Sequence, residues 1–136
     1  MTQNDEQFKD RYVFEETLLP CGFQFPDAYL DIMHLPELPK LTPWWFLGER
    51  KASALFWLST LKEQYPSRLL IPFAKRDDLS DTLAAFDGSD TSGNTKVFHI
   101  HAYTEPGWEQ RGTWDSFEDW YKQAILDAKE FKADEE

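Results

Sequence analysis

Three strand-like segments separated by turn-rich stretches constrain the fold of this chain more than any other feature of its sequence. They run from Leu69 to Ala74, from Thr82 to Asp87 and from Lys96 to Tyr103. The stretch before the third segment is rich in Gly, Ser, Asp and Asn, which favour tight turns. Strands joined in this way predict an antiparallel meander. Pro72 predicts either an edge strand or a strand whose proline faces away from its neighbour.

Apolar residues at helical spacing occur before, between and after these strands. The predicted helices cover Asp5 to Leu19, Pro26 to Leu35, Glu49 to Tyr65 and Asp115 to Phe131. In the last helix, Asp115 is expected to cap the first turn in a capping box with Glu118. The sequence that follows Phe131 is an acidic tail, residues 132–136, which we expect to be frayed.

Three prolines between His34 and Pro43 exclude both a helix interior and a central strand there, so this stretch is a connector. Trp44 to Leu47 follows it with the bulky residues of a short strand. We therefore predict a single α+β domain over residues 1–136, with its ordered core at about 5–131. An antiparallel or mixed sheet of about four strands is packed by N-terminal, central and C-terminal helices.

The charge balance limits the classes of partner. The 136 residues include 25 Asp and Glu against 14 Lys and Arg, a formal charge of -11. Nucleic acid and anionic membranes are thus excluded as the main partner, because phosphate contacts need clustered cations, whereas a basic protein fits. A hydrophobic content of 41% is too high for a disordered acidic chain.

The compartment is predicted from what the sequence lacks. Cys21 is the one cysteine, so no internal disulfide forms, and the polar N-terminus has no secretory pattern. The longest apolar runs fall far short of the roughly 20 residues that span a bilayer. We expect a cytoplasmic protein without a transmembrane helix.

Acidic residues are concentrated around the second strand-like segment. Between residues 77 and 95 there is no Lys or Arg, and there are five aspartates: Asp77, Asp78, Asp81, Asp87 and Asp90. One interpretation is a negative surface that steers a basic partner, and the other is an ordinary solvated loop region. Three tryptophans are candidate anchors for a partner, with core packing as the alternative: Trp44 and Trp45 in a segment flanked by proline, and Trp108 in a loop that contains glycine.

Residues with catalytic or metal-binding chemistry are few. His99 and His101 lie two apart on a predicted strand and face the same side, but zinc sites use three or four ligands. The alternative places both on the solvent face of the sheet. The loop from Asp87 to Asn94 lacks the ligand spacing of a calcium loop, and Cys21 has no nucleophile signature around it. We predict no catalytic residue, no metal and no cofactor.

The ordered set of motifs resembles the SUKH superfamily, which includes fungal regulators of cell-wall glucan synthesis and bacterial immunity proteins. The resemblance covers about Phe8 to Phe131. It rests on the following segments: CGFQFPDAYLDIM at 21–33, LIPFA at 70–74, Asp81 to Asp87, Val97 at the start of a strand, and SFEDW at 116–120. The chain departs from the family pattern at His34 to Pro39, where many members have an Asn-Gly turn, and at Ser80, where Gly is usual.

This resemblance implies an α+β domain that is not an enzyme and that works by binding a protein. The leading hypothesis is an immunity protein that neutralises a cognate toxin, for example a basic nuclease, by direct association. The alternative is a regulatory or scaffold domain, related to cell-wall synthesis regulators, that binds a host protein or a small ligand. A third hypothesis, a metal-dependent enzyme using His99 and His101, requires metal to co-purify with the protein.

Overall fold

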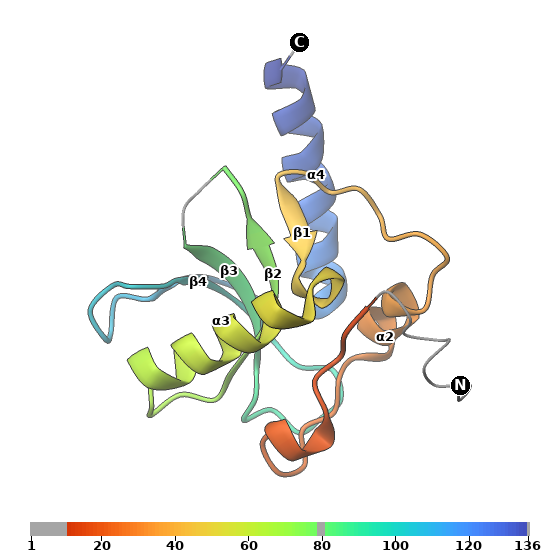
Figure 1. Ribbon diagram of the computed structural model, residues 1–136. Helices are drawn as coiled ribbons and strands as arrows, with labels where there is room; N and C mark the ends of the chain where they lie inside the picture. The colour runs from red at the N-terminus through yellow and green to blue at the C-terminus, as the bar shows by residue number, and fades with distance from the viewer. Residues whose placement is uncertain (1–10, 79–80, 136) are drawn as a thin grey trace.

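The computed structural model describes residues 11–78 and 81–135 of the chain (Figure 1). Its elements, in order, are η1 (Glu16–Leu18), α2 (Asp27–Met33), β1 (Trp44–Phe46), η2 (Leu47–Glu49), α3 (Lys51–Gln64), β2 (Leu70–Arg76), β3 (Thr82–Asp87), β4 (Val97–His101), β5 (Gln110–Trp114) and α4 (Phe117–Glu135). The strands form one sheet in the order β1-β2-β3-β4-β5, and all neighbours are antiparallel. The predicted α+β class is confirmed, with five strands where about four were expected.

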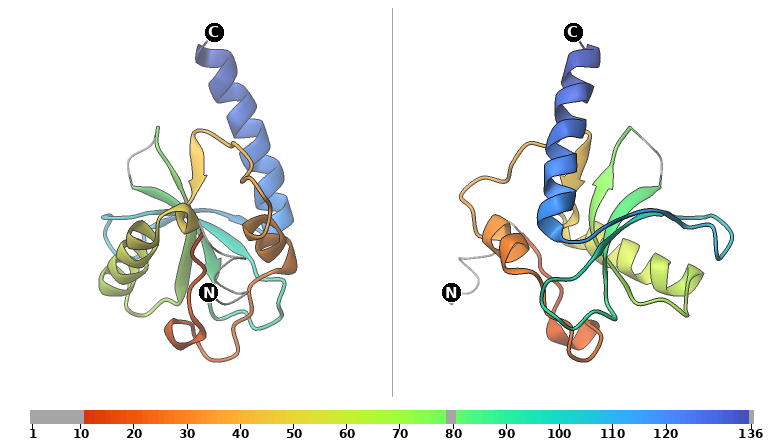
Figure 2. Two further views of the ribbon diagram at one scale, coloured as in Figure 1. Left: turned by 45° about the vertical axis from the view of Figure 1, so that its right-hand side comes forward. Right: turned by 180° about the vertical axis from the view of Figure 1, so that it is seen from behind.

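Helices cover both faces of the sheet. The left view of Figure 2 shows α3 on one face and α2 with α4 on the other. On the α4 face, Phe73 of β2 stacks on Phe86 of β3 with 4.2 Å between ring centroids. Trp120 of α4 meets Phe73 edge-on at 4.8 Å, and Tyr29 of α2 contacts the same two phenylalanines. Aromatic rings therefore fill the layer that joins the sheet to α2 and α4.

β2 lies inside the sheet, between β1 and β3, so of the two alternatives predicted from Pro72 the edge strand is wrong. The pairing of β2 with β3 shifts register between Pro72 and Ala74. A proline is tolerated at such an irregularity because the regular ladder of hydrogen bonds is interrupted there. β3 itself, Thr82–Asp87, has the bounds that the sequence predicted.

β5 is the fifth strand, which the sequence pattern did not predict. Its sequence, QRGTW, is polar and contains Gly112, and none of its residues is buried. It is the last strand of the sheet, and it pairs only with β4, as in the register Trp114↔Val97. An edge strand exposed in this way lacks the apolar alternation by which strands are found in a sequence.

The predicted first helix, Asp5 to Leu19, is not present in the described residues. Its first part lies outside them, and within residues 11–19 only η1 is helical. The Tyr12 N–H donates to the Gly48 carbonyl at 2.7 Å, and the Arg11 guanidinium donates to the carbonyls of Met33, Leu35 and Pro36. These long-range contacts hold the chain extended and override a weak helical pattern.

α4 begins one residue later than its predicted cap implies and continues further than predicted. The Ser116 hydroxyl, and not Asp115, accepts the Asp119 N–H at 3.2 Å. The helix continues to Glu135, so the described residues after Phe131 are helical and not a frayed tail. Its last turns project past the edge of the sheet (Figure 1).

Candidate protein-binding surface

The five aspartates do not form one patch. Asp77, Asp78 and Asp81 lie around the β2–β3 turn, whereas Asp87 ends β3 and Asp90 lies in the loop after it. β3 is six residues long, which separates the two groups by about 20 Å at the usual rise of a strand. The aspartates are close in sequence because β3, which separates the two groups, is short, but an extended strand holds its two ends far apart in space.

The group at the β2–β3 turn is partly neutralised by a neighbouring cation. Asp78 forms an ion pair with Arg76 at 2.8 Å, and the hydrogen bond between them is the main cause that raises the pKa of Arg76. Asp77 accepts a hydrogen bond from Trp45 Nε1 at 2.8 Å. Asp77 and Asp78 remain exposed. This turn therefore presents carboxylates to solvent, but its net charge is smaller than the sequence count implies.

The second group shapes its own loop. Asp87 Oδ1 accepts hydrogen bonds from the Ser89 N–H and hydroxyl, and Asp90 Oδ1 accepts the Ser92 N–H at 3.0 Å. The Ser92 hydrogen bonds lower the pKa of Asp90. In such a turn the aspartate side chain accepts a hydrogen bond from the backbone two residues later and so mimics the hydrogen bond of a backbone turn. The structure thus gives Asp87 and Asp90 a role in the loop's own conformation.

The three candidate tryptophans differ in exposure. Trp44 is only 3% exposed, because it packs against Trp120 and donates its Nε1–H to Asp127. It is a core residue, so it is not available as a surface anchor. Trp45 is half-buried, with the Arg50 guanidinium over its ring. Trp108 is 70% exposed, the highest value among the large apolar residues described.

His99 and His101 do lie on the same side of β4, paired with Ala84 and Thr82 of β3. They are half-buried, which corrects their assignment to an open solvent face. The His99 ring stacks on Trp114 at 5.9 Å, and burial is the main cause that lowers its pKa. Within residues 11–78 and 81–135, no group of three or more His, Cys, Asp or Glu is placed to hold a metal ion.

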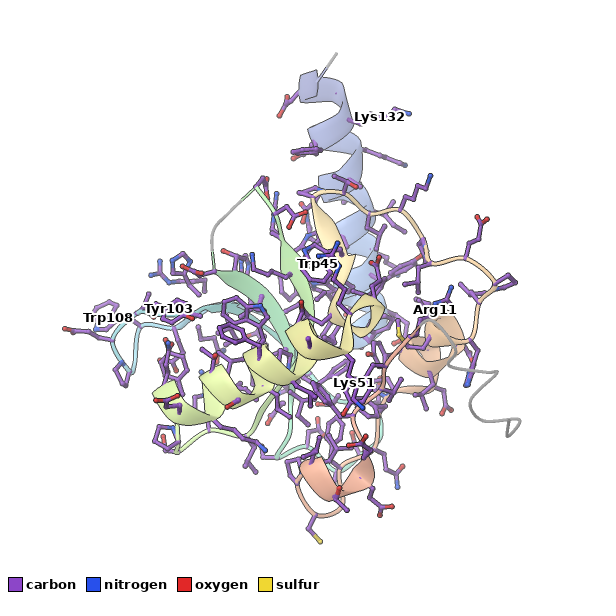
Figure 3. The ribbon with its side chains drawn as sticks, in the orientation of Figure 1. Arg11, Trp45, Lys51, Tyr103, Trp108 and Lys132 are labelled. Carbon is purple, nitrogen blue, oxygen red and sulfur yellow. The ribbon has the colours of Figure 1, made fainter. Side chains whose placement is uncertain are left out.

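Exposed aromatic side chains gather where α3 meets the β4–β5 loop. We call Phe56, Tyr103 and Trp108, together with the buried Trp57 that lies between Phe56 and Tyr103, the aromatic ridge. Phe56 is 55% exposed and Tyr103 56% exposed, and the Trp57 ring lies 5.1 Å from Phe56 and 6.0 Å from Tyr103. Figure 3 shows Tyr103 and Trp108 together at the end of the β4–β5 hairpin. Sequence reasoning missed Phe56, Trp57 and Tyr103.

A signal for Phe56 was present in the sequence. The buried residues of α3 include Ala54, Leu58 and Leu61. Phe56 is two residues from both Ala54 and Leu58, which places it on the opposite side of the helix. A large aromatic residue on the outer side of an amphipathic helix is a candidate contact residue. Tyr103 had no such signal, because its exposure depends on how the loop is held.

Hydrogen bonds fix that loop to α3. The Tyr103 N–H donates to Gln64 Oε1 at 2.7 Å, and the buried Tyr65 hydroxyl donates to the Thr104 carbonyl at 2.9 Å. Tyr103 has a positive φ of 63°, a conformation that costs a non-glycine residue energy and that these contacts hold in place. The ridge is therefore presented by a fixed backbone, which lowers the entropic cost of binding.

The β5 side of the hairpin is held by the buried carboxylate of Glu109, the residue before β5. Glu109 is 5% exposed; it pairs with Arg68 at 2.7 Å and accepts the Gly107 N–H at 2.6 Å. Burial alone would raise the pKa of Glu109, but hydrogen bonds from Arg68 and Gly107 outweigh burial and lower it. The ionised carboxylate is therefore the form that the folded protein stabilises.

Replacing Glu109→Gln should lower the free energy of unfolding by about 1–3 kcal/mol at pH 7, the cost of losing a charged hydrogen bond. Because the folded pKa is lowered, the wild-type advantage is complete above about pH 4.5, the ordinary Glu value, and is lost as the pH falls through the folded pKa. Urea unfolding at pH 7 and pH 3 measures both quantities. An energy difference that is the same at the two pH values would contradict this role.

Comparison with known proteins gives no relative: no family model, no curated protein and no solved structure matches this chain. Among the residues that the structure describes, no helix is both long and apolar enough to cross a membrane.

Proposed function

We propose that this chain is a non-enzymatic protein-binding domain that neutralises a toxin by direct association, as in the immunity proteins that its sequence resembles. The aromatic ridge is the observation that supports this proposal. Three of its side chains are more than half exposed on a backbone fixed by hydrogen bonds. Tryptophan and tyrosine are enriched among the residues that dominate the energy of protein interfaces.

The charge of the chain favours a basic partner such as a nuclease domain. The formal charge is -11, and Asp77 and Asp78 are exposed at the β2–β3 turn. A negative protein attracts a positive one over distances beyond contact, which speeds association. The proposal includes a cytoplasmic location, since a reducing compartment keeps the exposed Cys21 as a free thiol.

The test is capture followed by kinetics. The tagged chain is used to pull down the product of a neighbouring toxin gene, and stopped-flow fluorescence then gives the association rate at 50 and 500 mM salt. We expect the rate to fall by about tenfold or more as salt screens the opposite charges. A rate that does not change with salt would remove the electrostatic part of the proposal, and failure to bind the toxin would remove the immunity function.

A further inference from the structure

A groove runs between the connector of residues 34–43 and the C-terminal half of α4. Its volume is about 580 Å³, and its apolar surface comes from Leu41, Ile125, Ala128 and Phe131. The last three recur every three residues, which places them along one side of α4. Sites for small ligands are concave, mostly apolar and about 300–1,000 Å³ in volume. The groove has the size and lining of such a site.

Lysines surround this apolar surface from both walls. Lys40 comes from the connector, and Lys129 and Lys132 come from α4; Figure 3 shows Lys132 extending away from the helix. None of the three forms an ion pair with a described residue. Among the side chains that the structure describes, no acidic one lines the groove. A chain of charge -11 thus presents a locally positive hollow.

Three acidic residues of the same half of α4 lie on another side of the helix. Asp127, Glu130 and Asp134 recur at spacings of three and four, which defines a second stripe. The Asp127 carboxylate accepts the Trp44 Nε1–H and pairs with Arg76 at 3.5 Å. On this half of α4 the Asp127 carboxylate thus lies toward β1 and β2, whereas Lys129 and Lys132 line the groove.

We propose that this groove binds a small amphiphilic anion, in which an apolar chain or ring carries a carboxylate, sulfate or phosphate. The apolar part lies on Leu41, Ile125 and Phe131, and the anionic group lies between Lys129, Lys132 and Lys40. A free ligand fits better than a membrane surface, because the lysines border a hollow of molecular size and stable membrane binding requires a larger apolar or polybasic face. This site goes beyond the proposed protein-binding function and does not depend on it.

Three chains of equal length with different head groups test the proposal. The full chain is titrated by calorimetry with dodecanoate, dodecyltrimethylammonium and dodecyl maltoside, each below its micelle concentration. We expect saturable binding of dodecanoate with amide NMR shifts at residues 125–132, and binding of the other two that is weaker by about tenfold or more, since a charge-assisted hydrogen bond is worth at least that factor.

Matched lysine variants locate the site. The double variant Lys129→Gln with Lys132→Gln should weaken dodecanoate binding by about tenfold or more. Lys122→Gln, on the same helix but outside the groove, should bind dodecanoate as the wild type does, and circular dichroism checks that both variants stay folded. Equal binding of all three head groups, wild-type affinity in the double variant, or no binding of dodecanoate would each overturn the proposal. Binding to anionic phosphatidylglycerol vesicles without binding to free dodecanoate would also overturn it.

Discussion

Replacing Trp120→Ala should lower the free energy of unfolding by about 3–5 kcal/mol, the usual cost of removing a large aromatic side chain from a core. Trp120 is 1% exposed, and its ring packs against Trp44, Phe73 and Phe117 at 5.3, 4.8 and 5.7 Å. The substitution leaves a cavity between α4 and the sheet. Urea unfolding followed by circular dichroism measures the loss.

Leu126→Ala is the matched control for this experiment. Leu126 lies on the same helix and is 52% exposed, so its truncation should change the free energy of unfolding by no more than about 0.5 kcal/mol. A Trp120→Ala protein as stable as this control would show that α4 does not pack on the sheet through Trp120.

Replacing Trp108→Ala should weaken binding of the captured protein partner by about 30-fold or more, which corresponds to an interface residue worth about 2 kcal/mol. The stability of the free protein should hardly change, because the side chain is 70% exposed. Surface plasmon resonance gives the affinity, and urea unfolding gives the stability. The loss should appear mainly as a faster dissociation rate.

Two further variants separate the aromatic ridge from exposed apolar residues in general. Phe56→Ala should also weaken binding, whereas Leu126→Ala, at a similar exposure of 52% but on α4, should not. If Trp108→Ala and Leu126→Ala bind the partner equally well, the ridge is not the contact surface.

The sequence was most informative where local pattern and tertiary packing agree. β3 was predicted with its observed bounds, because its apolar run is buried on both faces of the sheet and polar turns flank it. The helices α2, α3 and α4 were predicted because each has an apolar side that faces the core. The prediction of the first helix was wrong because Arg11 and Tyr12 are held by the backbone of distant segments. β5 was not predicted because a polar edge strand has no apolar period.

The candidate site was less predictable, because exposure depends on contacts between distant segments. Trp44 and Trp45 are adjacent in sequence, yet Trp44 faces Trp120 and is buried, while Trp45 is half-buried beside Arg50. Tyr103 is exposed because Gln64, which is 39 residues away, binds its backbone. The acidic residues look contiguous in sequence, but β3 carries them to opposite ends of the sheet. None of these relations is visible from residue spacing alone.

Amide hydrogen exchange of the complex with the captured partner tests the central claim, that the aromatic ridge is the binding surface, most directly. Exchange rates are compared for the free and bound chain by mass spectrometry. We expect slower exchange on binding at residues 102–109 and in α3 around Phe56 and Trp57, with little change in the C-terminal half of α4. A complex in which those segments exchange as in the free protein, while protection appears elsewhere, would contradict the claim.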